Sequence, residues 1–195
     1  NMLALVRVSK NEEVIIKRVL DAGADGIVVP MVKNAVDAQR AVNYSMYPPI
    51  GTRGVGLARA QNYGYGFSKY QEKVNETIII AQIEHVDAIN ELDSILKVDG
   101  IAGTIIGPYD LSGSLGLPGD FDNESVKNLL DEYKRVSIEM DKLMGFHVVD
   151  SNPELVEKKI EEGYRFIAYG TDFLFMGDRA IEGMLNLRPI SLMKD

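Results

Sequence analysis

Two acidic residues, Glu84 and Asp110, each follow an apolar segment and are well placed to act together on a ligand. Glu84 closes the run TIIIAQIE, and Asp110 closes the run IAGTIIGPYD. The ends of neighbouring parallel strands lie about 4.8 Å apart, and two carboxylates held that close repel each other unless a proton or a cation lies between them. Carboxylate ligands, without cysteine or a histidine cluster, suit Mg²⁺ or Mn²⁺. We therefore predict a divalent metal site at Glu84 and Asp110, with two solvated acids at strand-to-loop junctions as the alternative.

Two glycine-rich segments have the composition of ligand-binding loops. Residues 48–56 read PPIGTRGVG, in which glycines let the backbone approach a ligand and Arg53 carries the two-donor fork that clamps a carboxylate. The alternative is a proline/glycine turn with a solvated arginine. Residues 107–120 read GPYDLSGSLGLPGD and follow an apolar segment directly, which is where a barrel builds its site. A mobile loop has the same composition.

The two histidines of the chain have different expected positions. His147 lies in GFHVVD near the end of a predicted strand, where it can face a pocket as a general base or metal ligand. A hydrogen-bonded structural role is the alternative. His85 follows Glu84, so strand alternation turns it to the opposite side, and we expect a packed or surface histidine.

Six short apolar segments are predicted to be β-strands, at residues 3–8, 26–29, 77–83, 101–106, 143–149 and 165–169. Most are continuous apolar runs, as in parallel strands that are covered on both faces. Helical patterns lie between or after them, at residues 11–22, 86–96, 124–143, 153–162 and 178–187. Repeated strand–helix units predict an α/β fold with a parallel sheet, either an open doubly wound sheet or a barrel.

Polar residues at the ends of the predicted strands favour the barrel. They are Arg7, Glu84, Asp110, His147 and Asp172, and such residues converge on one face of a (β/α)₈ TIM barrel. A complete barrel needs roughly 250 residues, whereas this chain has 195 residues and six strand segments. We therefore expect a single barrel domain over residues 1–195 with about six βα units, the third to the eighth, and without two N-terminal βα units.

Charge and composition narrow the class of protein. The chain has 21 Lys+Arg against 29 Asp+Glu, a net charge of −8, which argues against nucleic acid or an anionic membrane as the partner. No apolar run approaches the roughly 20 residues that span a bilayer, and residues 1–10 lack the layout of a signal peptide. The absence of cysteine fits a reducing compartment, so we expect a cytoplasmic protein.

Four motifs in this order and spacing resemble those of a known family. GADGIVVPMV, PPIGTRGVG, AQIE and GTIIGPYDLSGSLG are similar to segments of the HpcH/HpaI aldolases, which are metal-dependent (class II) pyruvate aldolases. The resemblance extends from about residue 6 to residue 183. It implies a barrel of the phosphoenolpyruvate/pyruvate superfamily and a homo-oligomer, commonly a hexamer whose subunits exchange their last helix.

The resemblance also implies roles for individual residues. Glu84 and Asp110 match the ligands of the divalent metal, which would be Mg²⁺ or Mn²⁺ with Co²⁺ as a further candidate. Arg53 matches the arginine that contacts the pyruvate carboxylate and enolate and is therefore the expected catalytic residue. Gln82 matches a polar neighbour of the bound keto acid.

The remaining expected substrate contacts lie on the glycine-rich segment and near the end of the fifth strand. The backbone at Gly107, Pro108 and Tyr109 would face the substrate carboxylate, and His147 would lie near the aldehyde part. Tyr109 stands where many members carry a small residue, and His147 where an aliphatic residue is common. Nothing in the chain matches the D-G-E-H stretch that carries the family's catalytic histidine.

Together these features predict an aldolase that reversibly cleaves a 4-hydroxy-2-oxo acid of the 2-keto-3-deoxy type to pyruvate and an aldehyde, through a pyruvate enolate stabilised by the metal. Two alternatives use the same scaffold and carboxylate pair: a lyase for an acyl-CoA of the malyl or citramalyl type, and an oxaloacetate decarboxylase. A third alternative is a non-catalytic binding or regulatory protein built on a degenerate barrel. The expected partners are the small keto acid, pyruvate and aldehyde, together with further copies of the same chain.

Overall fold

A single parallel sheet organises the computed structural model, which describes residues 2–187. Its strands run in the order β1-β2-β3-β4-β5-β6, and every neighbouring pair is parallel. Their bounds are β1 Leu5–Arg7, β2 Gly26–Val29, β3 Ile78–Ile83, β4 Gly103–Ile106, β5 Leu143–Val148 and β6 Phe166–Tyr169. Each of the six predicted strands is confirmed, with ends that differ by no more than two residues.

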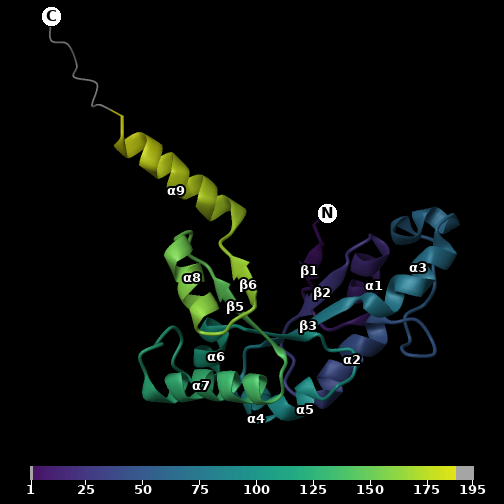
Figure 1. Ribbon diagram of the computed structural model, residues 1–195, viewed down its shortest axis with the longest axis horizontal. Helices are drawn as coiled ribbons and strands as arrows, with labels where there is room; N and C mark the ends of the chain where they lie inside the picture. Colours follow the sequence, from purple (N-terminus) through teal and green to yellow (C-terminus); the bar gives the residue numbers. More distant parts are fainter. Residues whose placement is uncertain (1, 188–195) are drawn as a thin grey trace, which may run out of the picture.

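The helices lie along one side of the sheet, which curls into a half-barrel (Figure 1). They are α1 Glu13–Asp21, α2 Ala35–Ser45, α3 Phe67–Lys73, α4 Val86–Asn90, α5 Leu92–Leu96, α6 Pro108–Ser114, α7 Glu124–Glu139, α8 Pro153–Glu161 and α9 Asp172–Leu185. Two 3₁₀ turns, η1 Arg59–Gly64 and η2 Val74–Glu76, flank α3. Only α9 projects away from the sheet in this view (Figure 1). The parallel α/β architecture is therefore confirmed, and the curl agrees with part of a TIM-type barrel.

Several helices differ from the sequence-based expectation, including α3, which was not expected, and α9, which begins at Asp172 and not at residue 178. The helix expected at residues 86–96 is broken at Glu91, whose backbone leaves the helical region (φ −106°, ψ 12°), so that α4 and α5 are separate. No helix was expected where α2 forms, although its N-cap Asn34 accepts a 2.9 Å hydrogen bond from the Asp37 amide. The segment expected as a glycine-rich loop at residues 107–120 opens with a short helix, α6.

The two faces of the sheet bury different amounts of apolar surface. The outer face packs against the helices and forms the main core, which includes Ile27, Ile79 and Ile83, each fully buried. The inner face carries a smaller buried cluster of Val28, Ile80 and Ile105. Because both faces are covered, the strands are apolar almost throughout, which explains why they lack a simple alternation in sequence.

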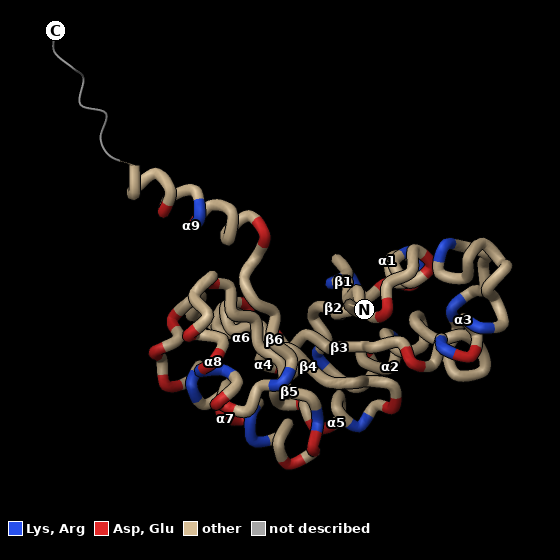
Figure 2. Tube along the Cα trace, turned by 45° about the horizontal axis from the view of Figure 1, so that its top comes forward, with Lys and Arg blue, Asp and Glu red and all other residues tan. Residues whose placement is uncertain are grey.

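Charged residues are concentrated on the outer helices and loops, whereas the strands are mostly uncharged (Figure 2). Arg7 and Glu84, at the ends of β1 and β3, are therefore exceptions. Among the described residues, no helix is both long and apolar enough to cross a membrane.

A buried tyrosine links α7 to two strands and provides a test of this packing. The Tyr133 hydroxyl lies 2.9 Å from the Thr104 hydroxyl and accepts a 3.2 Å hydrogen bond from the Gly145 amide. Tyr133→Phe removes the hydroxyl and leaves Thr104 and the Gly145 amide without this hydrogen-bond partner in the core. We therefore expect the free energy of unfolding to fall by about 1–3 kcal/mol in urea denaturation. Tyr65→Phe, at a residue that is 94% exposed, is the control and should change it by less than about 0.5 kcal/mol. Equal effects of the two substitutions would contradict the role of the Tyr133 hydroxyl.

Candidate active site

Glu84 is a buried carboxylate at the end of β3, with only 3% of the residue exposed. One carboxylate oxygen accepts a 2.8 Å hydrogen bond from the Met31 amide, and the other accepts a 2.7 Å hydrogen bond from Gln82 Nε2. Met31 follows β2 with a positive φ of 53°, an uncommon conformation for a residue with a side chain. Neighbouring strand ends therefore hold this carboxylate at a defined place.

The surroundings of Glu84 raise the pKa of its carboxyl group. Burial is the main cause, and the negative charge of Asp110 raises this pKa further. The Met31 amide and the positive charge of Arg7 act in the opposite direction but do not cancel the effect. Glu84 and Asp110 are thus close enough to repel each other, as expected for the predicted carboxylate pair.

A pocket of about 550 Å³ opens beside this pair, on the inner face of the sheet at the ends of the strands. Most of the residues predicted to bind substrate or metal line it: Gln82, Gly107, Pro108, Tyr109, Asp110 and His147. Glu84 lies at its edge, because a Cβ atom added to Gly107 would come within 3.4 Å of a Glu84 carboxylate oxygen. Glycine at position 107 therefore leaves room for a ligand to approach that oxygen.

Arg7 completes the polar side of the pocket, although the sequence analysis did not include it among the site residues. Its Nε donates a 3.2 Å hydrogen bond to Gln82 Oε1, and Gln82 in turn donates to Glu84. A continuous chain of hydrogen bonds thus joins Arg7, Gln82 and Glu84. In the sequence, Arg7 was recognisable as a polar residue at the end of a predicted strand. The motif around Arg53 was nevertheless preferred as the source of the arginine that binds the substrate carboxylate.

Arg53, by contrast, does not reach this pocket. It is fully buried, and its guanidinium donates to Asp21 (2.7 Å), the Tyr70 hydroxyl (3.0 Å) and the Ser45 carbonyl (3.3 Å). The guanidinium carbon also lies 4.9 Å from the centroid of the Tyr47 ring. Asp21 ends α1, and a helix that returns between parallel strands ends near the start of the next strand. The structure therefore does not place Arg53 in contact with a ligand of the pocket, because its donors hold the ends of helices together instead.

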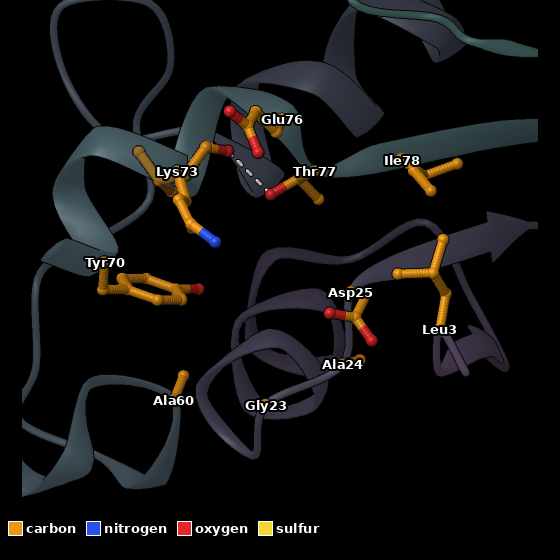
Figure 3. A pocket seen from close by; sticks show the side chains of 11 residues that line it. Leu3, Gly23, Ala24, Asp25, Ala60, Tyr70, Lys73, Glu76, Thr77 and Ile78 are labelled. Carbon is orange, nitrogen blue, oxygen red and sulfur yellow. Dashed lines mark hydrogen bonds between the residues drawn. The ribbon is translucent and has the colours of Figure 1, made fainter. Parts of the chain in front are cut away.

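A smaller pocket, of about 320 Å³, lies at this opposite end of the strands (Figure 3). Its lining includes Tyr70 and Lys73 from α3, as well as Asp25 and Ile78 from the starts of β2 and β3. None of the residues predicted for the active site lines it. The two cavities are therefore distinct, and only the larger one is lined by Asp110 and has Glu84 at its edge.

The described residues contain no cluster of three or more histidine, aspartate or glutamate side chains that could hold a metal. A metal at Glu84 and Asp110 would thus have two protein ligands and would take the others from water and substrate. That arrangement is common for Mg²⁺, which usually keeps several waters and one or two carboxylates.

Comparison with known proteins identifies similar chains. The sequence model of the HpcH/HpaI aldolase/citrate lyase family matches residues 1–176. A 2-keto-3-deoxy-L-rhamnonate aldolase from Klebsiella pneumoniae subsp. pneumoniae is 40% identical over 170 residues, which cover 86% of this chain and 63% of the relative. A protein of the same name from Escherichia coli O6:K15:H31 is 36% identical over 177 residues, covering 89% of this chain and 65% of that protein. The chain therefore spans somewhat less than two thirds of the length of these curated relatives.

Solved structures show the same fold. An HpcH/HpaI aldolase/citrate lyase family protein from Burkholderia cenocepacia J2315 superposes with a TM-score of 0.87 at 27% identity, covering 93% of this chain and 72% of that one. An HpcH/HpaI aldolase from Desulfitobacterium hafniense DCB-2 gives a TM-score of 0.84 at 27% identity, covering 100% of this chain and 75% of that one.

The placement of Arg53 predicts a role in stability. Arg53→Met removes the 2.7 Å ion pair with the partly buried Asp21, while Lys17 still pairs with this carboxylate at 2.5 Å. The Tyr70 hydroxyl and the Ser45 carbonyl also lose their hydrogen bonds to Arg53, so we expect a loss of about 1–3 kcal/mol in the free energy of unfolding at pH 7. Burial alone raises the pKa of Asp21, but hydrogen bonds from Arg53 and Lys17 outweigh this and lower it below its ordinary value of 3.8. The stabilisation is therefore present above pH 3.8 and is lost as pH falls through the lower pKa of the folded state, so the difference between wild type and variant should narrow in acid.

The control is Arg40→Met, because Arg40 forms an exposed ion pair with Asp37 and is 44% exposed. It should change stability by no more than about 1 kcal/mol. A stable Arg53→Met protein would contradict the structural role.

Proposed function

The chain belongs to the HpcH/HpaI aldolase/citrate lyase family, and from this premise we propose that it is a metal-dependent aldolase. Its reaction would be the reversible cleavage of a 4-hydroxy-2-oxo acid of the 2-keto-3-deoxy type to pyruvate and an aldehyde. One observation carries the proposal: the buried carboxylate of Glu84 and the exposed carboxylate of Asp110 lie close together beside a cation, Arg7, at one pocket. The relatives named as 2-keto-3-deoxy-L-rhamnonate aldolases support the same class of substrate. The chain would form the third to eighth βα units of a TIM barrel.

The pair of carboxylates fits a divalent cation. Glu84 is buried, its pKa is raised by burial and by Asp110, and a cation between the two would relieve both causes. Glu84 and Asp110 would hold Mg²⁺ or Mn²⁺, with Co²⁺ as a further candidate. When bound, the metal supplies Lewis-acid stabilisation of the negative charge that develops on the keto oxygen.

Arg7 takes the role that the sequence analysis assigned to Arg53. Its guanidinium lines the pocket and carries donors suited to a carboxylate, while Gln82 fixes its orientation through a 3.2 Å hydrogen bond. Arg7 would bind the carboxylate of the keto acid and place positive charge near the enolate. A preorganised charge of this kind stabilises the transition state without rearrangement during the reaction.

The keto acid would lie against Gly107, where the missing side chain leaves the approach to Glu84 open. Pro108 and Tyr109 continue this wall into the first turn of α6, next to Asp110. His147 lines the pocket from β5 and would lie beside the aldehyde half of the substrate. The two halves of the substrate would thus contact different walls of one cavity.

We also propose a homo-oligomer, with a hexamer as the expected size. The supporting observation is α9, which projects from the sheet (Figure 1) and carries large exposed apolar side chains. Phe173, Met176, Ile181, Met184 and Leu185 are each at least 60% exposed. An apolar face of this kind is typical of a helix that packs against another subunit.

Metal removal tests the carboxylate pair. We expect EDTA to abolish pyruvate release from a 4-hydroxy-2-oxo acid and Mg²⁺ or Mn²⁺ to restore it. Glu84→Gln and Asp110→Asn should each raise the half-saturating metal concentration by at least about tenfold, or about 1.4 kcal/mol. Because the pKa of Glu84 is raised, protons compete with the cation, and the wild-type requirement for metal should grow as pH falls.

The control for the metal site is Asp87→Asn, because Asp87 is an acidic residue close to Glu84 in sequence whose side chain is exposed. This substitution should leave the metal requirement unchanged. Activity that persists in EDTA and is trapped by borohydride would instead indicate a lysine Schiff base.

Substitution of Arg7 tests its proposed contact with the substrate carboxylate. Arg7→Lys keeps the charge but loses the planar fork, so kcat/KM should fall at least about tenfold, which is about 1.4 kcal/mol. Part of the loss should appear in kcat, because the enolate carries more charge than the ketone. Arg18→Lys, on the exposed side of α1, should leave both constants unchanged. Unchanged constants in Arg7→Lys would refute its role in substrate binding.

A further inference from the structure

A third cavity, of about 480 Å³, adjoins the candidate active site between α7 and α8, and we call it the side pocket. Pro108, Tyr109, His147 and Val149 line both cavities. The two cavities therefore share a rim at the start of α6 and the end of β5, although Leu130 and Phe146 of the side pocket pack against the main core, on the helix-covered side of the sheet. A ligand that enters both cavities would cross this rim.

The walls of the side pocket are apolar and largely aromatic. Phe121 comes from the loop before α7, Leu130 from α7, Phe146 from β5 and Tyr164 from the turn before β6. The rings of Phe146 and Tyr164 meet edge to face, with their centroids 5.2 Å apart and their planes at 67°. The aromatic ring of a ligand in this cavity could pack against these side chains in the edge-to-face or offset-stacked geometry that aromatic pairs prefer.

Two lysines also line the side pocket, and both are already partnered. Lys134 and Lys159 each donate to Glu162, with shortest distances of 2.9 Å. Lys159 Nζ also lies 4.5 Å from the centroid of the Phe146 ring. Because Glu162 pairs with both ammonium groups, an anionic ligand gains little here, whereas the face of an aromatic ring is attracted to such cations.

A ligand rich in hydroxyl groups fits these walls poorly. Phe121, Leu130 and Phe146 offer no side-chain hydrogen-bonding group, and a hydroxyl buried against them would lose its bonds to water without replacement. A water molecule occupies about 30 Å³ in the liquid. If each non-hydrogen atom of a ligand takes a similar volume, the cavity has room for roughly fifteen of them.

We infer that the side pocket holds an aromatic substituent of the aldehyde, so that the substrate is a 4-hydroxy-2-oxo acid with an aryl or arylalkyl group at C4. The inference rests on the proposed function and specifies its substrate class. In the synthetic direction, C3 of pyruvate loses a proton and forms the new bond to the aldehyde carbon, while the aldehyde oxygen gains a proton as the C4 hydroxyl.

The test compares phenylacetaldehyde with glyceraldehyde as the acceptor of pyruvate, using the metal-loaded protein. We expect kcat/KM to be at least tenfold higher with phenylacetaldehyde. Leu130→Phe fills part of the side pocket and should lower this value at least tenfold, while the value for glyceraldehyde changes less than twofold. Ile138→Phe is the matched control, because Ile138 lies on the same helix at 65% exposure and outside the cavity; it should change neither value.

Binding of 2-phenylethanol, measured by ligand-observed NMR, provides a readout that does not depend on catalysis. We expect binding to wild type and Ile138→Phe, and loss of binding in Leu130→Phe. Equal or better use of glyceraldehyde would overturn the inference while leaving the aldolase proposal intact. Binding of 2-phenylethanol without addition of pyruvate to any aldehyde would refute the proposed function and, with it, the substrate role of the side pocket. Absence of binding would show that the cavity is not an aromatic site.

Discussion

The buried carboxylate of Glu84 is the constraint on which the arrangement of the site depends. An ionised carboxylate that is 3% exposed has lost most of its water, and such a charge is costly unless hydrogen bonds or opposite charges replace that water. The Met31 amide and Gln82 supply one hydrogen bond to each oxygen, yet the pKa of Glu84 remains raised. The protein thus holds the carboxylate rigidly while leaving its charge incompletely balanced, which favours a cation.

Parallel pairing of the strands makes this arrangement possible. Side chains alternate between the faces of β3, so Ile80 and Gln82 point inward and Glu84, one step further, reaches the same side. The pairing of Arg7 with Val28, and of Val28 with Ile80, places the end of β1 level with the middle of β3. A shift of one residue would turn Gln82 into the outer core and break its contact with Arg7.

The strands and the carboxylate pair were predictable because their signals are local. An apolar run bounded by turns indicates a buried strand, and an acid at its end lies at the sheet's edge wherever the helices pack. The position of Arg53 was not predictable in this way. Its glycine-rich motif fits a ligand loop and a structural turn equally well, and only the folded arrangement of α1 and α3 around it brings Asp21 and Tyr70 to its guanidinium. Helix α2 was missed because its buried face is weakly apolar in sequence: it consists of Ala38, Ala41, Val42 and Ser45.

The polar and apolar walls around the site divide the recognition of a substrate into two tasks. Arg7, Gln82 and the carboxylate pair lie where β1, β3 and β4 end, and they can recognise the features that every 2-oxo acid shares. The apolar walls lie on α7 and β5, outside the hydrogen-bonded chain from Arg7 to Glu84. Leu130 and Phe121 form no hydrogen bond with those polar groups. Substitutions at these two positions can therefore change which aldehyde is accepted without disturbing the groups at the site of bond cleavage. Separate walls for the two halves would therefore allow relatives to keep one reaction while differing in substrate.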